Sequence, residues 1–286
     1  MKIYSISNLN NERKYTFTSH KPHKSRKMQL QQDRCDFRNV ELKVFDFESY
    51  TIYKGNVSVD MSKPQDITLV TDDKNNEKKP LILHYNPKWV AQVQERVIDK
   101  KTGKLVKKPL DVRILSTFDG GWTTSYHIMR SDLSEEIGYV TLEDYNKRAK
   151  FLPFDSEQGI TVAFLQNNND KKYAGIGRLA DRLEIEYCLK NNIPLRIESE
   201  ADPGSHVAHY KRGKRFFPLE TEELKEFFNE KYHCEDVNKV VENLIAKNNG
   251  EKINTYNWDG IMMYLPKNII DMYVEKIKTS PILKDD

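Results

Sequence analysis

The sequence predicts a mixed α/β fold in which a largely antiparallel central sheet is flanked by helices. Two segments of strand-like pattern, residues 123–132 and 135–144, are joined by a short acidic loop and indicate an antiparallel pair. The near-continuous apolar run at residues 159–167 indicates a central strand buried on both faces. A doubly wound parallel sheet would alternate strands and helices from its first strand, so these consecutive strands favour a mixed sheet.

The elements after this apolar strand are predicted from their periodicity. Apolar residues recur at helical spacing from about Gly175 to Asn191, and Pro194 marks the end of that helix. In chain order we then expect a strand at 194–201, a short helix leading into a strand at 205–217, charged helices at 219–250, a strand at 258–266 and a closing helix at 268–278.

The first hundred residues follow a different pattern. Residues 1 to about 38 are polar and basic and predict an arm or a weakly ordered start. From Val40 apolar and polar residues alternate, which indicates strands, with turn chemistry at Lys54–Asn56. A helix is predicted from Pro87, because proline suits a first helical turn and apolar residues follow at a spacing of four, namely Trp89, Val93 and Val97.

Composition limits the classes of function. The 286 residues carry 46 Lys and Arg against 43 Asp and Glu, and a net charge of +3 argues against nucleic acid as the main partner. The three cysteines are scattered without a CxxC pair, so we expect a reducing compartment and no metal site. No apolar run reaches the ~18 residues of a membrane span. We therefore expect a cytoplasmic protein without a membrane segment, with non-classical export left open.

The stretch 172–178, KYAGIGR, is the strongest candidate for a binding site. A strand, a glycine-bearing loop and a helix start form a recurrent anion site, because the first N–H groups of a helix have no intrahelical partner and face the positive end of its dipole. Gly175 and Gly177 let a phosphate approach the backbone, and Lys172 and Arg178 add positive charge. Gly-x-Gly alone is weak evidence, and a P-loop is excluded because no GK[ST] follows.

The block KKYAGIGRLADRLEIEYCLKNNIPLRI resembles motif A of the GCN5-related N-acetyltransferases, and SHVAHYKRGKRFF resembles their following motif. The likeness covers about residues 110–218 and the strand at 258–266. It departs from the family at Lys172, where Arg or Gln is usual, and in the spacing between Tyr210 and the next glycine. The resemblance divides the chain into an N-terminal region, 1–108, an acetyltransferase-like domain, 109–278, with an insertion at about 219–255, and a tail, 279–286.

The resemblance implies an acetyl-CoA-dependent N-acetyltransferase, with acetyl-CoA as the acyl donor, no metal and a primary amine on a small molecule or a protein as acceptor. The end of the preceding strand would splay open and pair with the pantetheine arm, and the loop amides would hold the pyrophosphate. The implied cofactor-binding residues are Leu165, Gln166, Asn167, Lys172, Tyr173, Ala174, Gly175, Ile176, Gly177 and Arg178.

Acyl transfer to an amine needs a base for the amine proton and an acid for the leaving thiolate. The resemblance makes Tyr210 the candidate acid, while packing of its helix is the alternative role. Glu143, acting through water, and His209 are candidate bases. Two alternatives stay open: a CoA-binding regulatory module without catalysis, and an N-terminal region that binds nucleic acid or another partner. A homodimer formed through the aromatic-rich strands is also compatible with the sequence.

Overall fold

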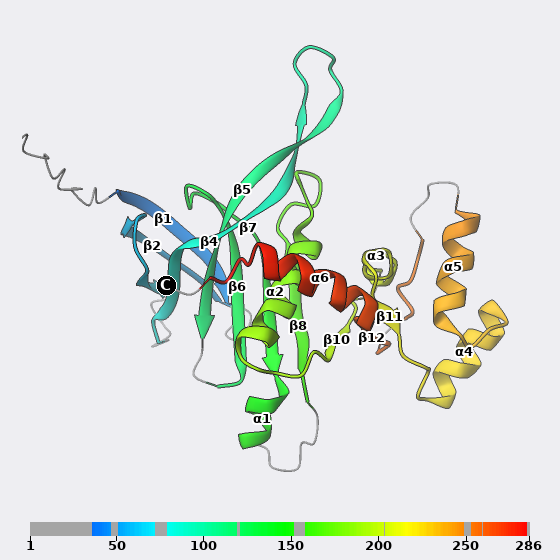
Figure 1. The fold of residues 1–286 in the computed structure, drawn as a ribbon. Coiled ribbons are helices and arrows are strands. Elements are labelled where there is room, and N and C mark those ends of the chain that lie inside the picture. The colour runs from blue at the N-terminus through cyan, green and yellow to red at the C-terminus, as the bar shows by residue number, and fades with distance from the viewer. Residues whose placement is uncertain are drawn as a thin grey trace, which may run out of the picture. The chain divides into compact units, whose positions relative to one another are not determined.

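The structure, a computed structural model, describes residues 36–46, 51–71, 79–118, 121–151, 158–202, 204–248, 253–258 and 260–284, which belong to one unit, Cys35–Asp286. Figure 1 shows how its elements are arranged. Its elements, in chain order, are β1 Phe37–Asp46, β2 Thr51–Asp60, β3 Gln65–Thr71, β4 Leu81–Ile98, β5 Leu105–Phe118, β6 Thr123–Arg130, β7 Glu136–Asp144, α1 Tyr145–Phe151, β8 Ile160–Asn167, β9 Tyr173–Ala174, α2 Ile176–Lys190, β10 Ile197–Glu200, α3 His206–Arg212, β11 Arg215–Phe216, α4 Glu222–Tyr232, α5 Val237–Lys247, β12 Met262–Tyr264 and α6 Lys267–Thr279.

The described strands form one mixed sheet of twelve strands, in the order β1-β2-β3-β4-β5-β6-β7-β8-β10-β12-β11, with β9 paired to β4. Among these pairs β8 and β10 run parallel, and their neighbours on both sides are antiparallel. The prediction of a mixed, largely antiparallel sheet is therefore confirmed. The expected hairpin is present as β6 and β7, and the expected interior strand is β8. The predicted burial of this strand on both faces is wrong, because only Ile160 and Val162 are buried and the rest is half-buried or exposed.

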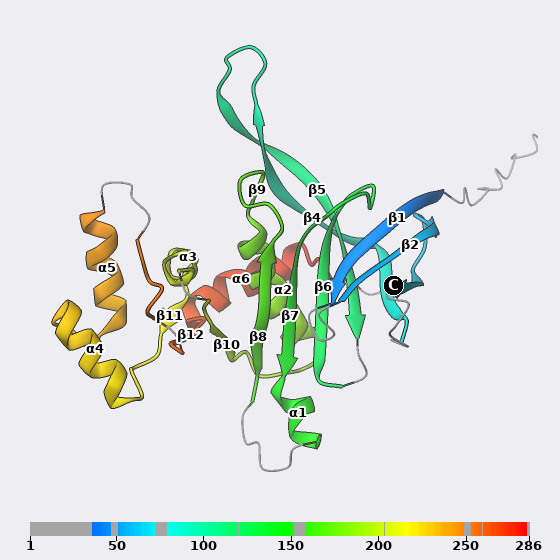
Figure 2. The ribbon, with the colours of Figure 1, turned by 180° about the vertical axis from the view of Figure 1, so that it is seen from behind.

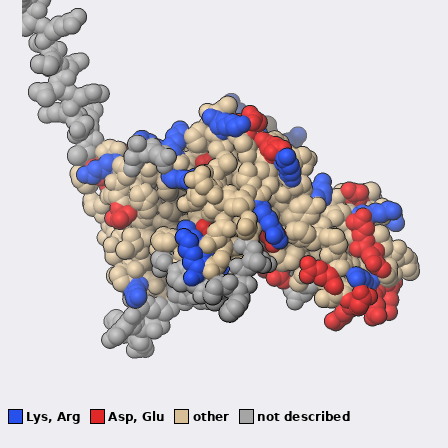
Figure 3. All heavy atoms as spheres, turned by 60° about the horizontal axis from the view of Figure 1, so that its bottom comes forward, with Lys and Arg blue, Asp and Glu red and all other residues tan. Residues whose placement is uncertain are grey.

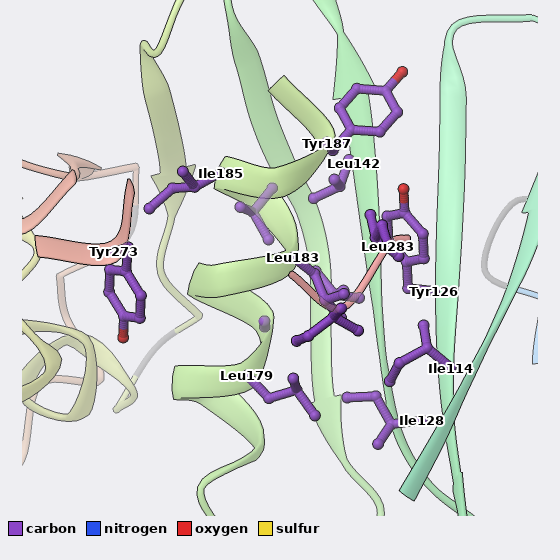
Figure 4. Packing of buried hydrophobic residues seen from close by; sticks show 14 of the residues in the cluster. Ile114, Tyr126, Ile128, Leu142, Leu179, Leu183, Ile185, Tyr187, Tyr273 and Leu283 are labelled. Atoms are coloured by element: carbon purple, nitrogen blue, oxygen red, sulfur yellow. The ribbon is translucent and has the colours of Figure 1, made fainter. Parts of the chain in front are cut away.

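Helices α2 and α6 cover one face of this sheet, as the two opposite views of the ribbon show (Figure 1, Figure 2). Figure 4 shows the core between these helices and the sheet, where Leu179 and Leu183 of α2 contact Ile128 of β6 and Leu142 of β7. Each of these residues is buried. The apolar stripe of α2, predicted from its spacing, is thus the face that the helix buries.

The N-terminal strands β1–β3 pack against the opposite face of the sheet. Their cluster joins Leu42 and Leu69 to Leu115 of β5 and Met129 of β6, all of which are buried. The boundary expected at residue 108 falls inside β5, which pairs with β4 from Leu105 onward. Strands on the two sides of that boundary therefore share one hydrogen-bonded ladder. The expected arm begins in residues 1–35, which lie outside the described residues.

The insertion at about 219–255 contains α4 and α5, as its charged helical pattern predicted. These helices form a separate apolar cluster with the end of the sheet, in which Phe228 of α4 lies 5.0 Å from Trp258 between ring centroids. Trp258 is fully buried and donates its indole N–H to the hydroxyl of Tyr232. The insertion is thus a small helical layer with its own core.

The helix predicted from Pro87 is wrong, because β4 continues through this segment as a strand. Residues at a spacing of four share a face in a strand as well as in a helix, so Trp89, Val93 and Val97 could not distinguish the two. The proline is tolerated because the register between β4 and β5 shifts between Tyr85 and Val90, and proline is accepted at such a bulge.

The turn predicted at Lys54–Asn56 is also wrong, because these residues lie in the middle of β2. Gly55 pairs there with Leu42, and the methyl group Cδ2 of Leu69 lies close beside it. A glycine in a strand often marks a place where a neighbouring side chain approaches closely, and that is its role here.

The two parallel strands β8 and β10 diverge after a short ladder. Residues 160–162 of β8 pair with 197–199 of β10, and the register between β7 and β8 then shifts so that Ala163 bulges. Beyond this bulge β8 remains paired with β7 alone among the described strands, up to Asn167. The edge of β8 that faces away from β7 is therefore open over its last residues, directly before the loop that leads to α2.

Gly138 of β7 determines how closely β7, β8 and the start of α2 pack. A Cβ atom at this position would lie 2.6 Å from the carbonyl oxygen of Gln166 and 2.9 Å from Cγ2 of Ile176. Because the first contact is with backbone, we expect Gly138→Ala to lower the free energy of unfolding by about 1–3 kcal/mol, measured by urea denaturation. Gly55→Ala is the matched control, since its nearest contact is a side-chain methyl at 3.3 Å. Equal stability of the two variants would contradict this packing.

Candidate anion-binding site

The loop between β8 and α2 is closed by its own hydrogen bonds. The N–H groups of Lys172 and Tyr173 both donate to the carbonyl oxygen of Asn169, at 3.1 and 2.8 Å. The side-chain amide of Asn167 donates to the carbonyl of Tyr173 at 3.1 Å. The loop then forms β9, in which Ala174 pairs with Gln94 of β4. The start of α2 is therefore fixed between β8 and β4.

Gly175 is the N-cap of α2 and adopts the left-handed conformation, with φ 92° and ψ −3°. This conformation is strained for residues with a Cβ atom, which explains a glycine at this position. No side chain caps the helix among the described residues. The first N–H groups of α2 have no intrahelical acceptor and lie at the positive end of the helix dipole. The helix start is thus suited to an anionic ligand.

Gly177, in the first turn of α2, lies directly against Arg212 at the end of α3. A Cβ atom at Gly177 would lie 2.7 Å from Nη1 of Arg212 and 2.8 Å from Cζ. The guanidinium is held there by the carboxylate of Asp181, at 3.2 Å from Nε, and by Nδ1 of His209, at 2.9 Å from Nη2. A positive charge from a distant part of the chain is therefore fixed beside the helix start.

A cleft of about 560 Å³ opens at this point between α2, α6 and strand β4. Gly175 and Gly177 line it, and the charged side chains among its described lining residues are all cationic. Two of these cations are neutralised by α2 itself, since Arg182 pairs with Glu186 and Arg212 with Asp181. The cations are Lys107, Arg178, Arg182, Arg212 and Lys276. The cleft combines a helix start with clustered cations and is therefore chemically suited to phosphate.

Behind the cleft lies a buried cluster of charges. Lys214, Asp181 and Glu184 are all fully buried. The ammonium of Lys214 lies 3.6 Å from the Glu184 carboxylate and 4.0 Å from that of Asp181, and it donates to the hydroxyl of Ser199 at 3.2 Å. The cluster links α2, β10 and the segment after α3. Because buried charges are costly to separate, it fixes α3 and Arg212 relative to α2.

Lys172 and Tyr173 lie at the loop but do not line this cleft. The ammonium of Lys172 lies 3.2 Å from Glu135 and 3.8 Å from Glu95. Tyr173 is buried and its hydroxyl donates to the same Glu135 carboxylate at 2.7 Å. Of the two cations expected to flank the helix start, Arg178 lines the cleft and Lys172 instead ties the loop to β4 and the start of β7.

The other expected cofactor-binding residues fall into two groups. Leu165, Gln166 and Asn167 form the end of β8, and each is paired with β7 on one side. Ile176 is buried in the core under α2, whereas Ala174 lines the cleft together with the two glycines. The structure thus brings the glycine turn and Arg178 together at one surface, whereas no residue of β8 is among the described lining residues of this cleft.

Glu143 lies at a second, acidic cleft of about 500 Å³. This cleft is lined by the bulged Ala163 of β8 and by Glu200 and Asp202 at the end of β10. The Glu143 carboxylate accepts a hydrogen bond from Arg148 at 3.3 Å. The acidic cleft therefore lies at the residues where β8 and β10 separate. It shares no described lining residue with the cationic cleft.

Tyr210 faces the insertion. Its ring stacks on Phe216 at 6.1 Å between centroids, and its hydroxyl donates to the carboxylate of Glu242 on α5 at 2.6 Å. Burial and the Glu242 hydrogen bond raise the pKa of Tyr210 to about 12. These contacts match the packing role that the sequence left open for this tyrosine.

His209 is buried beside the cationic cleft, where Nδ1 receives the hydrogen bond from Arg212. Burial, followed by the positive charge of Arg212, holds the pKa of His209 well below its usual value. The imidazole is therefore neutral at pH 7. Its Nδ1 lone pair is already used to orient Arg212, which leaves this nitrogen no lone pair for an amine proton.

A third cavity, of about 460 Å³, lies on the opposite face of the sheet beside β1. Phe45 and Tyr139 form an aromatic wall, with ring centroids 5.6 Å apart. Nearby, Nδ1 of His127 lies 2.6 Å from the Glu136 carboxylate, and both side chains are buried. One lysine, Lys43, is its only described cationic lining residue, so this cavity does not supply the charge that a pyrophosphate requires.

Several residues of the cationic cleft were not predicted from the sequence. Arg182 had a local signal, because it follows Arg178 by four residues and so lies on the same face of α2. Lys107, Arg212 and Lys276 come from β5, α3 and α6, and their positions depend on tertiary packing. The buried pair Asp181 and Glu184 also had a signal, since both interrupt the apolar stripe of α2.

Within the described residues, no group of three or more His, Cys, Asp and Glu side chains is arranged to hold a metal ion. None of the described helices is long and apolar enough to span a membrane. Neither the scan against protein-family models nor the search of curated proteins finds a match for this chain.

Glu184 gives the buried cluster a pH dependence. Burial raises the pKa of its carboxyl from 4.5 to about 7, although Lys214 opposes this shift. Because the folded state binds this proton more tightly, its contribution to stability is complete below about pH 4.5 and is lost as the pH rises through 7. We expect wild type to lose of the order of 3 kcal/mol relative to Glu184→Gln between pH 5 and pH 8.

Urea denaturation of both proteins at several pH values measures this difference. Glu226→Gln on α4 is the control, because it removes the same charge from an exposed position. Parallel pH profiles of wild type and Glu184→Gln would show that Glu184 does not hold a proton in the folded protein near neutrality.

Proposed function

We propose that this chain is an acetyl-CoA-dependent N-acetyltransferase related to the GCN5-like enzymes, with a primary amine as acceptor. The observation that carries the proposal is the separation of the parallel strands β8 and β10 directly before a glycine loop and the uncapped start of α2. The sequence resemblance predicts this arrangement for the pantetheine arm and the pyrophosphate of the donor. A cationic cleft at the helix start adds charge complementarity.

The residues present fit the phosphates of CoA in three respects. Gly175 leaves the start of α2 accessible, because a Cβ atom there would meet nothing within 4 Å, and Gly177 makes room for the guanidinium of Arg212. Arg178 and Arg212 supply guanidinium groups, which bind phosphate oxygens with two parallel hydrogen bonds. The open edge of β8 from Ala163 to Asn167 offers backbone groups of the kind that an amide-containing pantetheine arm pairs with.

The acceptor is proposed to enter at the acidic cleft, because its carboxylates attract a protonated amine and it lies where β8 and β10 separate. The donor supplies a thioester carbonyl carbon. In the reaction the amine nitrogen forms the new bond to that carbon and the carbon–sulfur bond breaks. Before the attack the protonated amine gives one proton through water to Glu143. The thiolate then takes a proton from an acid, which is restored by the second proton that the acylated nitrogen releases. The hydrogen bond from Arg148 holds the Glu143 carboxylate at the cleft.

The hydroxyl of Tyr210 donates a hydrogen bond to Glu242, and Nδ1 of His209 accepts one from Arg212. These contacts favour a second candidate function, a CoA-binding module of the same fold that regulates or interacts without transferring an acyl group. The two functions share the cationic cleft and differ in turnover, so binding and chemistry are tested separately.

Binding of CoA tests the feature that both functions share. We expect calorimetry to show that wild type binds CoA and that Gly177→Val weakens this binding at least about tenfold, because a branched side chain displaces Arg212. Weak binding of pantetheine, which lacks the phosphates, should change little. Gly55→Ala is the folded control. Absence of CoA binding by wild type would exclude both functions.

Thiol release from acetyl-CoA, measured over a panel of primary amines, separates the enzyme from the module. If Tyr210 is the acid, Tyr210→Phe lowers kcat by about 10²-fold or more with little change in KM. From its contacts we expect the packing result instead: kcat stays within a few-fold, and stability falls by about 1 kcal/mol through loss of the Glu242 hydrogen bond. A large loss of kcat at unchanged stability would assign the acid role to Tyr210.

A further inference from the structure

A two-stranded ribbon, residues 95–108, extends from the sheet beyond the glycine loop. It consists of the end of β4 and the start of β5, joined by a tight turn, and Figure 1 shows it projecting past the other strands. The pairing of β5 with β6 starts only at Val112, and β9 reaches β4 no further than Glu95. Beyond Arg96 and before Val112 the two edges of the ribbon are unpaired with the other described strands, and most of its side chains are exposed.

The ribbon carries a concentrated positive charge. Its 14 residues contain six basic and two acidic side chains, a net charge of +4, whereas the whole chain has +3. Arg96 is already engaged with the carbonyls of Asp170 and Tyr173. The remaining cations are exposed and form no ion pair with any described residue, and they are Lys100, Lys101, Lys104, Lys107 and Lys108. The near-neutral total thus conceals a local basic surface.

The compensating negative charge lies elsewhere in the same unit. The segment 220–247, which contains α4 and α5, has eight acidic and four basic side chains. Figure 3 shows these acidic side chains gathered at one end of the surface. The charge of the chain is therefore segregated, and the ribbon presents a positive field that its own sheet does not neutralise.

The lysines are distributed over both faces and the tip of the ribbon. Side chains alternate along a strand, so the cross-strand neighbours Arg96 and Lys107 lie on one face and Lys108 lies on the other. Lys100, Lys101 and Lys104 lie at the tip. A flat membrane contacts one face of a ribbon, whereas the major groove of a duplex admits a two-stranded ribbon and presents phosphates on both sides.

Two apolar side chains of the ribbon are exposed, Ile98 and Leu105, each at 62%. They are direct cross-strand partners, and Val97 and Val106 form the next pair. Such pairs stabilise a two-stranded ribbon that has no core beneath it. The apolar pairs are thus explained by the stability of the ribbon itself, and the lysines remain as its groups for binding.

We propose that the ribbon 95–108 is a binding surface for double-stranded nucleic acid, contacted through its phosphates without sequence preference. Lys107 lines the cationic cleft as well, so the positive surface continues from the ribbon to the start of α2. This inference rests on the charge and geometry of the ribbon and is independent of acyl transfer.

Fluorescence anisotropy with a labelled 20-base-pair duplex tests the inference. For five phosphate contacts the logarithm of the affinity falls against the logarithm of salt with a slope of about −4.5, so the affinity drops roughly 500-fold between 50 and 200 mM salt. The triple variant Lys100→Gln, Lys101→Gln, Lys104→Gln should bind at least about tenfold more weakly at 50 mM salt. Its slope should be shallower by about one for each lysine removed.

The matched control is Lys231→Gln, Lys239→Gln, Lys247→Gln, which removes the same charge from exposed positions on α4 and α5. It should bind the duplex within about threefold of wild type. Circular dichroism shows whether both triple variants are folded. The inference is overturned if wild type does not bind at 50 mM salt, if the two triple variants lose affinity equally, or if only anionic phospholipid vesicles bind.

Discussion

The buried contact of Lys214 with Asp181 and Glu184 is the constraint on which the candidate site depends. Charges removed from water are stable only while their partners stay in place, so α2, β10 and the segment after α3 cannot shift independently. Asp181 also holds Arg212, which lies against Gly177 at the start of α2. The buried charge cluster therefore fixes the position of Arg212, which lines the cationic cleft. A helix start that binds anions needs such support, because its backbone donors are useful only when the opposing cations are equally well fixed.

The predictable part of the fold was local in sequence. The strands β6, β7 and β8, helix α2 and the helices of the insertion follow from alternation or helical spacing, and each lies within about two residues of its predicted position or segment. The errors at Pro87 and Lys54–Asn56 have one cause. A spacing of four and a lone glycine both occur in strands, and only the packing of neighbouring strands decides that these segments are extended. The glycine turn was predictable for the same local reason. The three distant cations of the cleft were not, because Lys107, Arg212 and Lys276 meet only when β5, α3 and α6 are packed.

The same distinction explains why the cofactor half of the proposed site is better supported than the catalytic half. Phosphate recognition depends on backbone geometry at one turn, which the motif at 172–178 specifies. Acid and base chemistry depends on which side chains remain uncommitted after folding. Tyr210 and His209 are each committed to another residue, Glu242 and Arg212, and both bonds arise from elements far apart in the chain. Glu143 keeps a position at the separating strands, and its single ion pair with Arg148 leaves one carboxylate oxygen outside that hydrogen bond.

The ribbon and the glycine loop are joined by backbone hydrogen bonds. β9 pairs with β4 at Gln94 and Glu95, and the N–H of Arg96 donates to the carbonyl of Lys172 at 2.7 Å, so the loop is hydrogen-bonded to the base of the ribbon. A rigid ladder transmits displacement along its strands better than a loop does, because its hydrogen bonds and cross-strand pairs must move together. A polyanion on the ribbon would therefore act at the loop in two ways, through the position of β4 and through competition for Lys107. If both proposed ligands bind, any coupling between them is reciprocal, because each must then change the affinity of the other by the same factor.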